Sequence, residues 1–398
     1  MDKMEVGGSS MRSLEVLQEY LAKRPQELLR LKESGTKVVG YFPGDYVPEE
    51  IIHASGAIPI CLCRGGDPRA VAPALSVTTR FICPFSRALV GEKMLGESPY
   101  YALPDLVVAP VTCQHLRRAA DLWQYHSGDQ VFRLGVPLEY DSQHSLDYYL
   151  SRLEAMKQRL ESLTGAAIPD RKLEESIDLY NTLRGLFRRI SLLRKLSPSP
   201  LSALDFVKLN HASFLADPRF MVEVLSSLAE ELESDASPQT AAAGPRLLLT
   251  GPCLADGDYK VLEIAEELGA QIVAEEFCEG IRYYWGDVKR VGSPLEDLAR
   301  RYLAERLPGA FMLGSTARRF DFTLNLCREF KVTGVIWYEL LFCETYNVEG
   351  FPFARRMEEA GIPVLKLRSD YDAQDRGPLK TRIEAFLETL TGGIGNDG

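Results

Sequence analysis

The chain has 398 residues, which at roughly 150 residues per domain is enough for two or three domains. Apolar residues make up 45% and charged residues 26% of the sequence, a balance typical of globular proteins and unlike that of disordered or fibrous chains. With 46 basic and 56 acidic side chains the formal net charge is −10, so the chain on average repels phosphate backbones, and we do not expect it to bind nucleic acid.

The first twenty residues contain no apolar segment of the kind found in signal peptides, and no run of 18 apolar residues occurs in the sequence. We therefore expect a cytoplasmic protein without a membrane partner. In a reducing compartment its eight cysteines are not expected to form a disulfide framework. Closely spaced CxxC pairs are absent, so a metal site would have to be gathered by the fold.

The first half of the chain shows a helical pattern followed by alternating short apolar runs. Apolar residues at helical spacing in residues 13–31 predict an amphipathic helix within an N-terminal segment, residues 1–35. Four predicted strands follow, with helix-like stretches between them: residues 37–42, 57–62, 106–109 and 131–134. This alternation indicates βαβ units and a parallel sheet, so we predict a first α/β domain in residues 36–146.

The second half begins with a change of character. Residues 147–233 carry long, charged, Leu-rich helical patterns and are predicted to form a helical connecting region, followed by a small polar linker in residues 234–245. Apolar strands separated by helices then return, starting at Arg246, Gln271, Gly334 and Pro363. We therefore predict a second α/β domain with a parallel sheet in residues 246–398.

Several cysteines occupy positions suited to a ligand site. Four of them closely follow predicted strands, where an open parallel sheet forms its ligand crevice: Cys113, Cys253, Cys278 and Cys343. Cys83 precedes Pro84, in a turn that could present its thiol. Free cysteines are also among the most buried residues, so spacing alone leaves open both a shared metal site and an ordinary core. Zinc would more often recruit a histidine, and only His115 is close in sequence.

Six stretches, in order along nearly the whole chain, carry a family resemblance: GYFPGDYVPEEIIHASGAIPI, TRFICPFSR, DLVVAPVTCQHLRR, EEFCEGIRYYWGDV, LLFCETYNVEGFPFARRMEEAGIPVLKLRSDY and GPLKTRIEAFLETL. Together they resemble the D-component subunits of 2-hydroxyacyl-CoA dehydratases and benzoyl-CoA reductases. The combination is specific, although no single stretch is.

The resemblance implies two Rossmann-like domains and a [4Fe–4S] cluster held by Cys83, Cys113 and Cys343, which leaves one iron without a protein ligand. It also implies radical chemistry on a CoA thioester, either dehydration or ring reduction, after one-electron reduction by an ATP-dependent iron–sulfur activator. The chain would work with a homologous second subunit or a second copy of itself. No GxGxxG or GxxxxGK[ST] motif is present, so we do not expect this chain to hydrolyse ATP.

Glu50 and His53 are the candidates for acid–base catalysis. Glu50 is similar in position to a family carboxylate near the substrate, and His53 would share its helical face. Each also has a structural interpretation, since a carboxylate in the first turn of a helix is favourable and a histidine can be a satisfied structural residue.

Three alternatives remain open. Related double-cubane proteins carry an [8Fe–9S] cluster on six cysteines, and this chain could supply six: Cys63, Cys83, Cys113, Cys253, Cys278 and Cys343. Because Cys253 follows a proline where that pattern has glycine, we favour the single cube. The chain could instead be a non-catalytic electron-relay subunit. A zinc or metal-free binding protein would be colourless after anaerobic purification.

Overall fold

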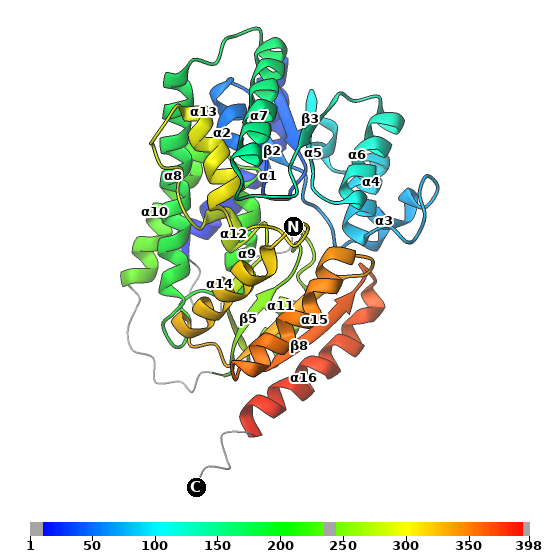
Figure 1. Ribbon diagram of the computed structural model, residues 1–398, viewed down its shortest axis with the longest axis vertical. Coiled ribbons are helices and arrows are strands. Elements are labelled where there is room, and N and C mark those ends of the chain that lie inside the picture. Colours follow the sequence, from blue (N-terminus) through cyan, green and yellow to red (C-terminus); the bar gives the residue numbers. More distant parts are fainter. Residues whose placement is uncertain (1–10, 235–243, 393–398) are drawn as a thin grey trace.

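A computed structural model describes residues 11–234 and 244–392 (Figure 1). It contains two four-stranded parallel sheets, which confirms the predicted α/β class with two parallel sheets. Most of the predicted linker, residues 235–243, lies outside the described residues. The proposed domain boundaries stay predictions.

All eight predicted strands are present. The first sheet has the order β2-β1-β3-β4 and the second β6-β5-β7-β8. The strands are β1 (Val38–Tyr41), β2 (Ile58–Cys61), β3 (Leu106–Val111), β4 (Val131–Gly135), β5 (Arg246–Thr250), β6 (Gln271–Glu276), β7 (Gly334–Leu340) and β8 (Val364–Ser369). Strands β1, β5 and β7 are buried along their whole length, which explains why they read as continuous apolar runs and not as alternating patterns.

The two sheets share one topology. In each sheet, the second strand of the chain lies on one side of the first strand, and the third and fourth strands lie on its other side. This reversal falls between β1 and β3 in the first sheet and between β5 and β7 in the second. Loops at such a reversal diverge at the carboxyl ends of the strands and leave a crevice between them, so the fold creates two crevices of the same kind.

Helices cover both sheets. Those around the first are α1 (Arg12–Glu33), α2 (Glu49–Ala54), α3 (Pro68–Ala74), α4 (Pro84–Leu95), α5 (Pro99–Ala102) and α6 (Gln114–Ser127). Those around the second are α11 (Lys260–Glu267), α12 (Ile281–Tyr284), α14 (Ser315–Glu329), α15 (Glu344–Glu359), a short 3₁₀ turn (Ala373–Asp375) and α16 (Arg376–Gly392). The helix α13 (Pro294–Ala299) and the π-helical turn that continues it (Arg300–Glu305) pack instead against the helical region that connects the two sheets (Figure 1). No helix in residues 11–234 or 244–392 has the length and apolar character needed to cross a membrane.

The predicted helical region consists of α7 (Gln143–Thr164), α8 (Asp170–Leu193), α9 (Ala203–Ser213) and α10 (Pro218–Ser234), and α7, α8 and α10 stand together on the left of Figure 1. Two buried arginines connect this region to the sheets. Arg184 of α8 pairs with Glu50 of α2 at 2.8 Å, and Arg194, directly after α8, makes a bidentate pair with Glu275 of β6 at 2.6 and 2.7 Å. Buried ion pairs of this kind fix the relative positions of the elements that carry them, because removing one partner leaves the other charge buried and unpaired.

The crossing of α3 and α4 yields a stability prediction. A Cβ atom added at Gly91 would lie 1.5 Å from the carbonyl oxygen of Ala70, so Gly91→Ala should force the two helices apart and destabilise the protein by about 3 kcal/mol or more. Gly185 in α8 is the matched control, since its nearest neighbour would be a flexible arginine at 3.7 Å. There the same change should stabilise the helix by roughly 0.5–1 kcal/mol. Chemical denaturation measures both, and equal effects would contradict the packing described.

Candidate functional site

The carboxyl ends of the two sheets border one cleft of about 100 Å³, which we call the cysteine cleft. Every strand except the edge strands β2, β4 and β8 contributes its following loop. Asp45 follows β1, and four cysteines follow the other strands: Cys113 after β3, Cys253 after β5, Cys278 after β6 and Cys343 after β7. The two reversal points of the fold therefore open into the same space.

Five of the eight cysteines line this cleft. The three that the resemblance implies as cluster ligands, Cys83, Cys113 and Cys343, lie there with Cys253 and Cys278. Among the described residues, no three His, Cys, Asp or Glu side chains are grouped closely enough to hold a single metal ion. In a four-iron cube each thiolate binds a different iron, so its ligands need not meet at one point. The ligand roles stay predictions, and so does the cluster.

Cys83, Cys113 and Cys343 share one local structure, because each is the residue immediately before a helix: α4, α6 and α15 respectively. The backbone N–H of Leu116 donates to the Cys113 sulfur at 3.4 Å, and the N–H of Tyr346 donates to Cys343. The free N–H groups and dipole of a helix N-terminus favour a thiolate or another anion. Three such ends therefore make this side of the cleft suitable for a negatively charged group.

The loop before α15 departs from ordinary backbone geometry. Phe342 has a φ of 65°, in the left-handed region that non-glycine residues rarely adopt. This conformation completes the turn from β7 into α15 and brings Cys343 into the cleft. Such outliers concentrate where function requires a particular placement.

Cys83 is buried, Cys113 and Cys343 are partly buried, and the three thiols influence one another. Burial, together with the neighbouring Cys113, raises the pKa of the Cys83 thiol to about 12. Burial also raises the pKa of Cys113, and raises that of Cys343 well above its ordinary value, where Cys83 and Cys113 add to the effect. Without a bound cation these groups hold their protons at neutral pH, so metal binding would release protons.

The remaining cysteines lie elsewhere. Cys63 follows β2 but does not line the cleft; it is buried next to Cys61, with which it shares a hydrogen bond. Cys327 is buried in α14 and packs in the core. His115 accepts the backbone N–H of Cys83 through Nδ1 at 3.2 Å and is not among the cleft residues.

A buried cationic network borders the cleft on the side of the second sheet. Arg282, which lines the cleft, and Arg319 both pair with Glu276 and both donate to the hydroxyl oxygen of Tyr346 at 2.6 Å. The two guanidiniums lower the pKa of Glu276 despite its burial, so this carboxylate stays ionised. Tyr346 also lines the cleft.

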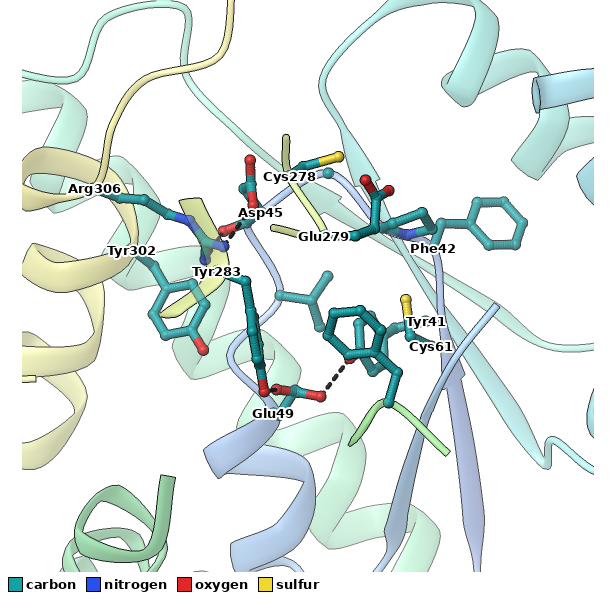
Figure 2. A pocket seen from close by; sticks show the side chains of 14 residues that line it. Tyr41, Phe42, Asp45, Glu49, Cys61, Cys278, Glu279, Tyr283, Tyr302 and Arg306 are labelled. Carbon is teal, nitrogen blue, oxygen red and sulfur yellow. Dashed lines mark hydrogen bonds and ion pairs between the residues drawn. The ribbon is translucent and has the colours of Figure 1, made fainter. Parts of the chain in front are cut away.

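A second, smaller cavity of about 30 Å³ adjoins the cleft, and we call it the inner chamber (Figure 2). Asp45, Cys278 and Glu279 line both spaces. At the opposite end of the chamber, Glu49 accepts hydrogen bonds from the hydroxyls of Tyr41 and Tyr283, the latter at 2.7 Å (Figure 2). Burial raises the pKa of Glu49 to about 7, which suits a group that exchanges protons near neutral pH.

Glu279, like Asp45, lines both the cysteine cleft and the inner chamber. Its Oε2 accepts the backbone N–H of Leu254 at 3.0 Å, while its buried Oε1 has no hydrogen-bond partner among the described residues. Burial raises its pKa to about 7. An unpartnered oxygen at this position indicates a site that is completed by water or a ligand.

The two predicted acid–base residues lie outside both cavities. Glu50 is fully buried, and its two oxygens are occupied by Arg184 and by the hydroxyl of Tyr302, each at 2.8 Å. His53 lies 2.7 Å through Nδ1 from the hydroxyl of Ser176, and burial lowers its pKa. Their catalytic roles stay predictions. The geometry favours the neighbouring Glu49 as the acid–base group, because Glu49 lines the inner chamber. The sequence alone does not single out Glu49, since the pattern of a six-residue helix does not show which of its faces meets a cavity.

Comparison with known proteins gives a family for this architecture. The family model described as 2-hydroxyglutaryl-CoA dehydratase, D-component, matches residues 45–390. The chain belongs to this family, which confirms the resemblance and makes the chain an enzyme of this dehydratase and reductase type.

The similar curated proteins match over nearly their whole length. One is a putative dehydratase subunit of Escherichia coli (strain K12), which is 27% identical and aligns over 91% of this chain and 94% of its own length. Another is a benzoyl-CoA reductase subunit of Thauera aromatica, which is 25% identical and aligns over 89% of this chain and 91% of its own length. The beta subunit of (R)-2-hydroxyglutaryl-CoA dehydratase from Acidaminococcus fermentans is 23% identical and aligns over 95% of this chain and 98% of its own length.

Glu49 gives a prediction on pH dependence. Its pKa is raised from 4.5 to about 7 in the folded protein, so the folded state binds this proton more tightly than the unfolded chain does. The free energy of unfolding should therefore fall as pH rises through the window from about 4.5 to 7 on account of this group. Glu49→Gln should remove up to about 3 kcal/mol of that fall, at about 1.4 kcal/mol per pKa unit.

Denaturation at several pH values, wild type against variant, measures the difference. Glu161→Gln is the control, because this partly exposed carboxyl has a lowered pKa and its change cannot reproduce the slope. Parallel curves for wild type and Glu49→Gln would show that Glu49 is ionised throughout the window.

Proposed function

We propose that this chain is an iron–sulfur subunit of a 2-hydroxyacyl-CoA dehydratase or aryl-CoA reductase that acts in the cytoplasm on a CoA thioester. The observation that carries the proposal is the convergence of Cys83, Cys113 and Cys343, each at a helix N-terminus, on one cleft between two sheets. The names of the relatives, dehydratase and benzoyl-CoA reductase subunits, support the reaction type.

The donor set suits a [4Fe–4S] cluster. Cys83, Cys113 and Cys343 would hold it, and the unpartnered Oε1 of Glu279 is the kind of orphaned polar atom that marks an incomplete site. When bound, such a cluster supplies one-electron chemistry and, with three thiolates on four irons, one iron open to a substrate oxygen.

The protein's own groups would do the rest. The three helix ends and Arg282 offset negative charge in the cleft, and the burial of its walls limits the access of water, which strengthens each electrostatic interaction. Glu49 and its two tyrosines hold or release a proton at the end of the inner chamber, next to the cleft.

Two partners belong to the proposal. A homologous second subunit, or a second copy of the chain, is supported by relatives that are named as subunits. An ATP-dependent iron–sulfur activator would deliver the electron. No Walker A motif occurs in this sequence, which is consistent with a separate ATPase.

A second candidate is an [8Fe–9S] double-cubane reductase. It is favoured by Cys253 and Cys278, which line the same cleft as the three proposed ligands. Against it, Cys63, needed as the sixth ligand, lies outside the cleft next to Cys61. An electron-relay subunit is a third possibility, and it would hold the cluster without responding to a CoA ester.

The test is iron and acid-labile sulfide per chain after strictly anaerobic purification. We expect about four irons for the single cube and about eight for the double cubane. Cys83→Ala, Cys113→Ala and Cys343→Ala should each lose most of the iron, because each removes a cluster ligand. Cys253→Ala and Cys278→Ala should keep four irons if the single cube is right.

Cys327→Ala is the matched control, since Cys327 is also buried but packs in the core away from the cleft. It should retain the iron of the wild type. Equal iron in the ligand variants and in this control would overturn the ligand assignment. A colourless, iron-free wild type after cluster reconstitution would overturn the proposed function.

A further inference from the structure

The hydroxyl of Tyr346 has an unusual set of neighbours. Its oxygen accepts one hydrogen bond from Nη1 of Arg282 and one from Nη1 of Arg319, both at 2.6 Å. A phenol oxygen has two lone pairs and one O–H, and guanidinium groups can only donate. Both acceptor positions are therefore taken, and the O–H must point away from the two arginines.

That O–H finds no acceptor among the described residues. Every hydrogen bond of the Tyr346 hydroxyl in the described ranges is one that the two arginines donate. Tyr346 is 7% exposed, yet it lines the cysteine cleft together with Cys343 and Thr345. A buried donor without a partner is unfavourable, so its position at the wall of a cleft points to an acceptor bound there.

The two cations also determine the chemical character of this donor. Hydrogen bonds from guanidinium groups withdraw electron density from the phenol oxygen and strengthen its O–H as a donor. Burial nevertheless raises the pKa of Tyr346 above its ordinary value, so the proton is retained at neutral pH. The hydroxyl is suited to an oxygen atom that gains negative charge during a reaction.

We propose that Tyr346 is a catalytic hydrogen-bond donor whose O–H binds the thioester carbonyl oxygen of the acyl-CoA substrate in the cysteine cleft. This inference rests on the proposed function, because that function supplies both the thioester and the electron that places negative charge on its oxygen. Arg282 and Arg319 are positioning residues, since they hold the phenol oxygen and direct its hydrogen towards the cleft. No bond is made or broken by Tyr346 itself.

The experiment compares ligands that differ only in the carbonyl group. Butyryl-CoA and benzoyl-CoA, and the thioether analogues in which a CH₂ replaces the carbonyl, are titrated into the anaerobic, iron-loaded full chain. For the wild type we expect the thioester to bind about ten- to a hundredfold more tightly than its thioether, because the thioether leaves the buried O–H of Tyr346 without an acceptor. Tyr346→Phe should reduce this preference at least about tenfold, because it removes the hydrogen bond, and it should keep the iron content of the wild type.

Tyr284→Phe is the matched control. It removes the hydroxyl of another buried tyrosine, which bonds Ser191 at 3.3 Å and does not line the cleft. The control should keep the thioester preference. If Tyr346→Phe loses iron, 3-fluorotyrosine at position 346 preserves the ring and makes a stronger donor, and it should increase the preference.

The outcomes separate the two claims. A wild type that prefers the thioester, together with a Tyr346→Phe variant that keeps that preference, overturns the role of Tyr346 and leaves the proposed function intact. Equal binding of thioester and thioether by the wild type does the same. An iron-loaded wild type that binds neither ligand overturns the proposed CoA thioester substrate and the inference with it.

Discussion

The structure depends on one constraint: two parallel sheets must direct the carboxyl ends of their strands at the same space. Each sheet reverses its strand order next to its first strand, and the loops after β1, β3, β5, β6 and β7 all reach the cysteine cleft. Neither sheet could gather these thiols alone, because Cys113 belongs to one half and Cys253, Cys278 and Cys343 to the other. The site is therefore a property of how the halves pack together.

Buried charges maintain that packing. Arg184 connects the helical region to Glu50 of α2, and Arg194 connects it to Glu275 of β6. Arg306 pairs with Asp45, a residue that lines the cleft, at 2.5 Å. Each pair is nearly free of solvent, and one buried partner without the other would be strongly unfavourable. Glu50, at the base of α2, thereby fixes the position of its neighbour Glu49 in the inner chamber. A carboxylate paired with Arg184 and a carboxylate that faces the inner chamber thus stand side by side in the sequence.

The elements that were predicted correctly are those with local signals. Buried parallel strands leave uninterrupted apolar runs, so all eight strands and the convergence of Cys113, Cys253, Cys278 and Cys343 at strand ends follow from pattern. Other features depend on tertiary contacts without a local signature. The helical pattern does not tell that Glu49, and not Glu50, lines the inner chamber, and Cys63 follows a strand as the others do but lies outside the cleft. The role of Tyr346 depends on two arginines from distant segments.

The central claim is that thiols from both halves of the chain hold one iron–sulfur cluster in the cysteine cleft. Diffraction from anaerobically grown crystals, recorded on either side of the iron absorption edge, tests it most directly because it locates iron without assuming a ligand. The account predicts anomalous density in the cleft between Cys83, Cys113 and Cys343. Iron located elsewhere in the molecule, or an iron-replete protein with an empty cleft, would contradict it.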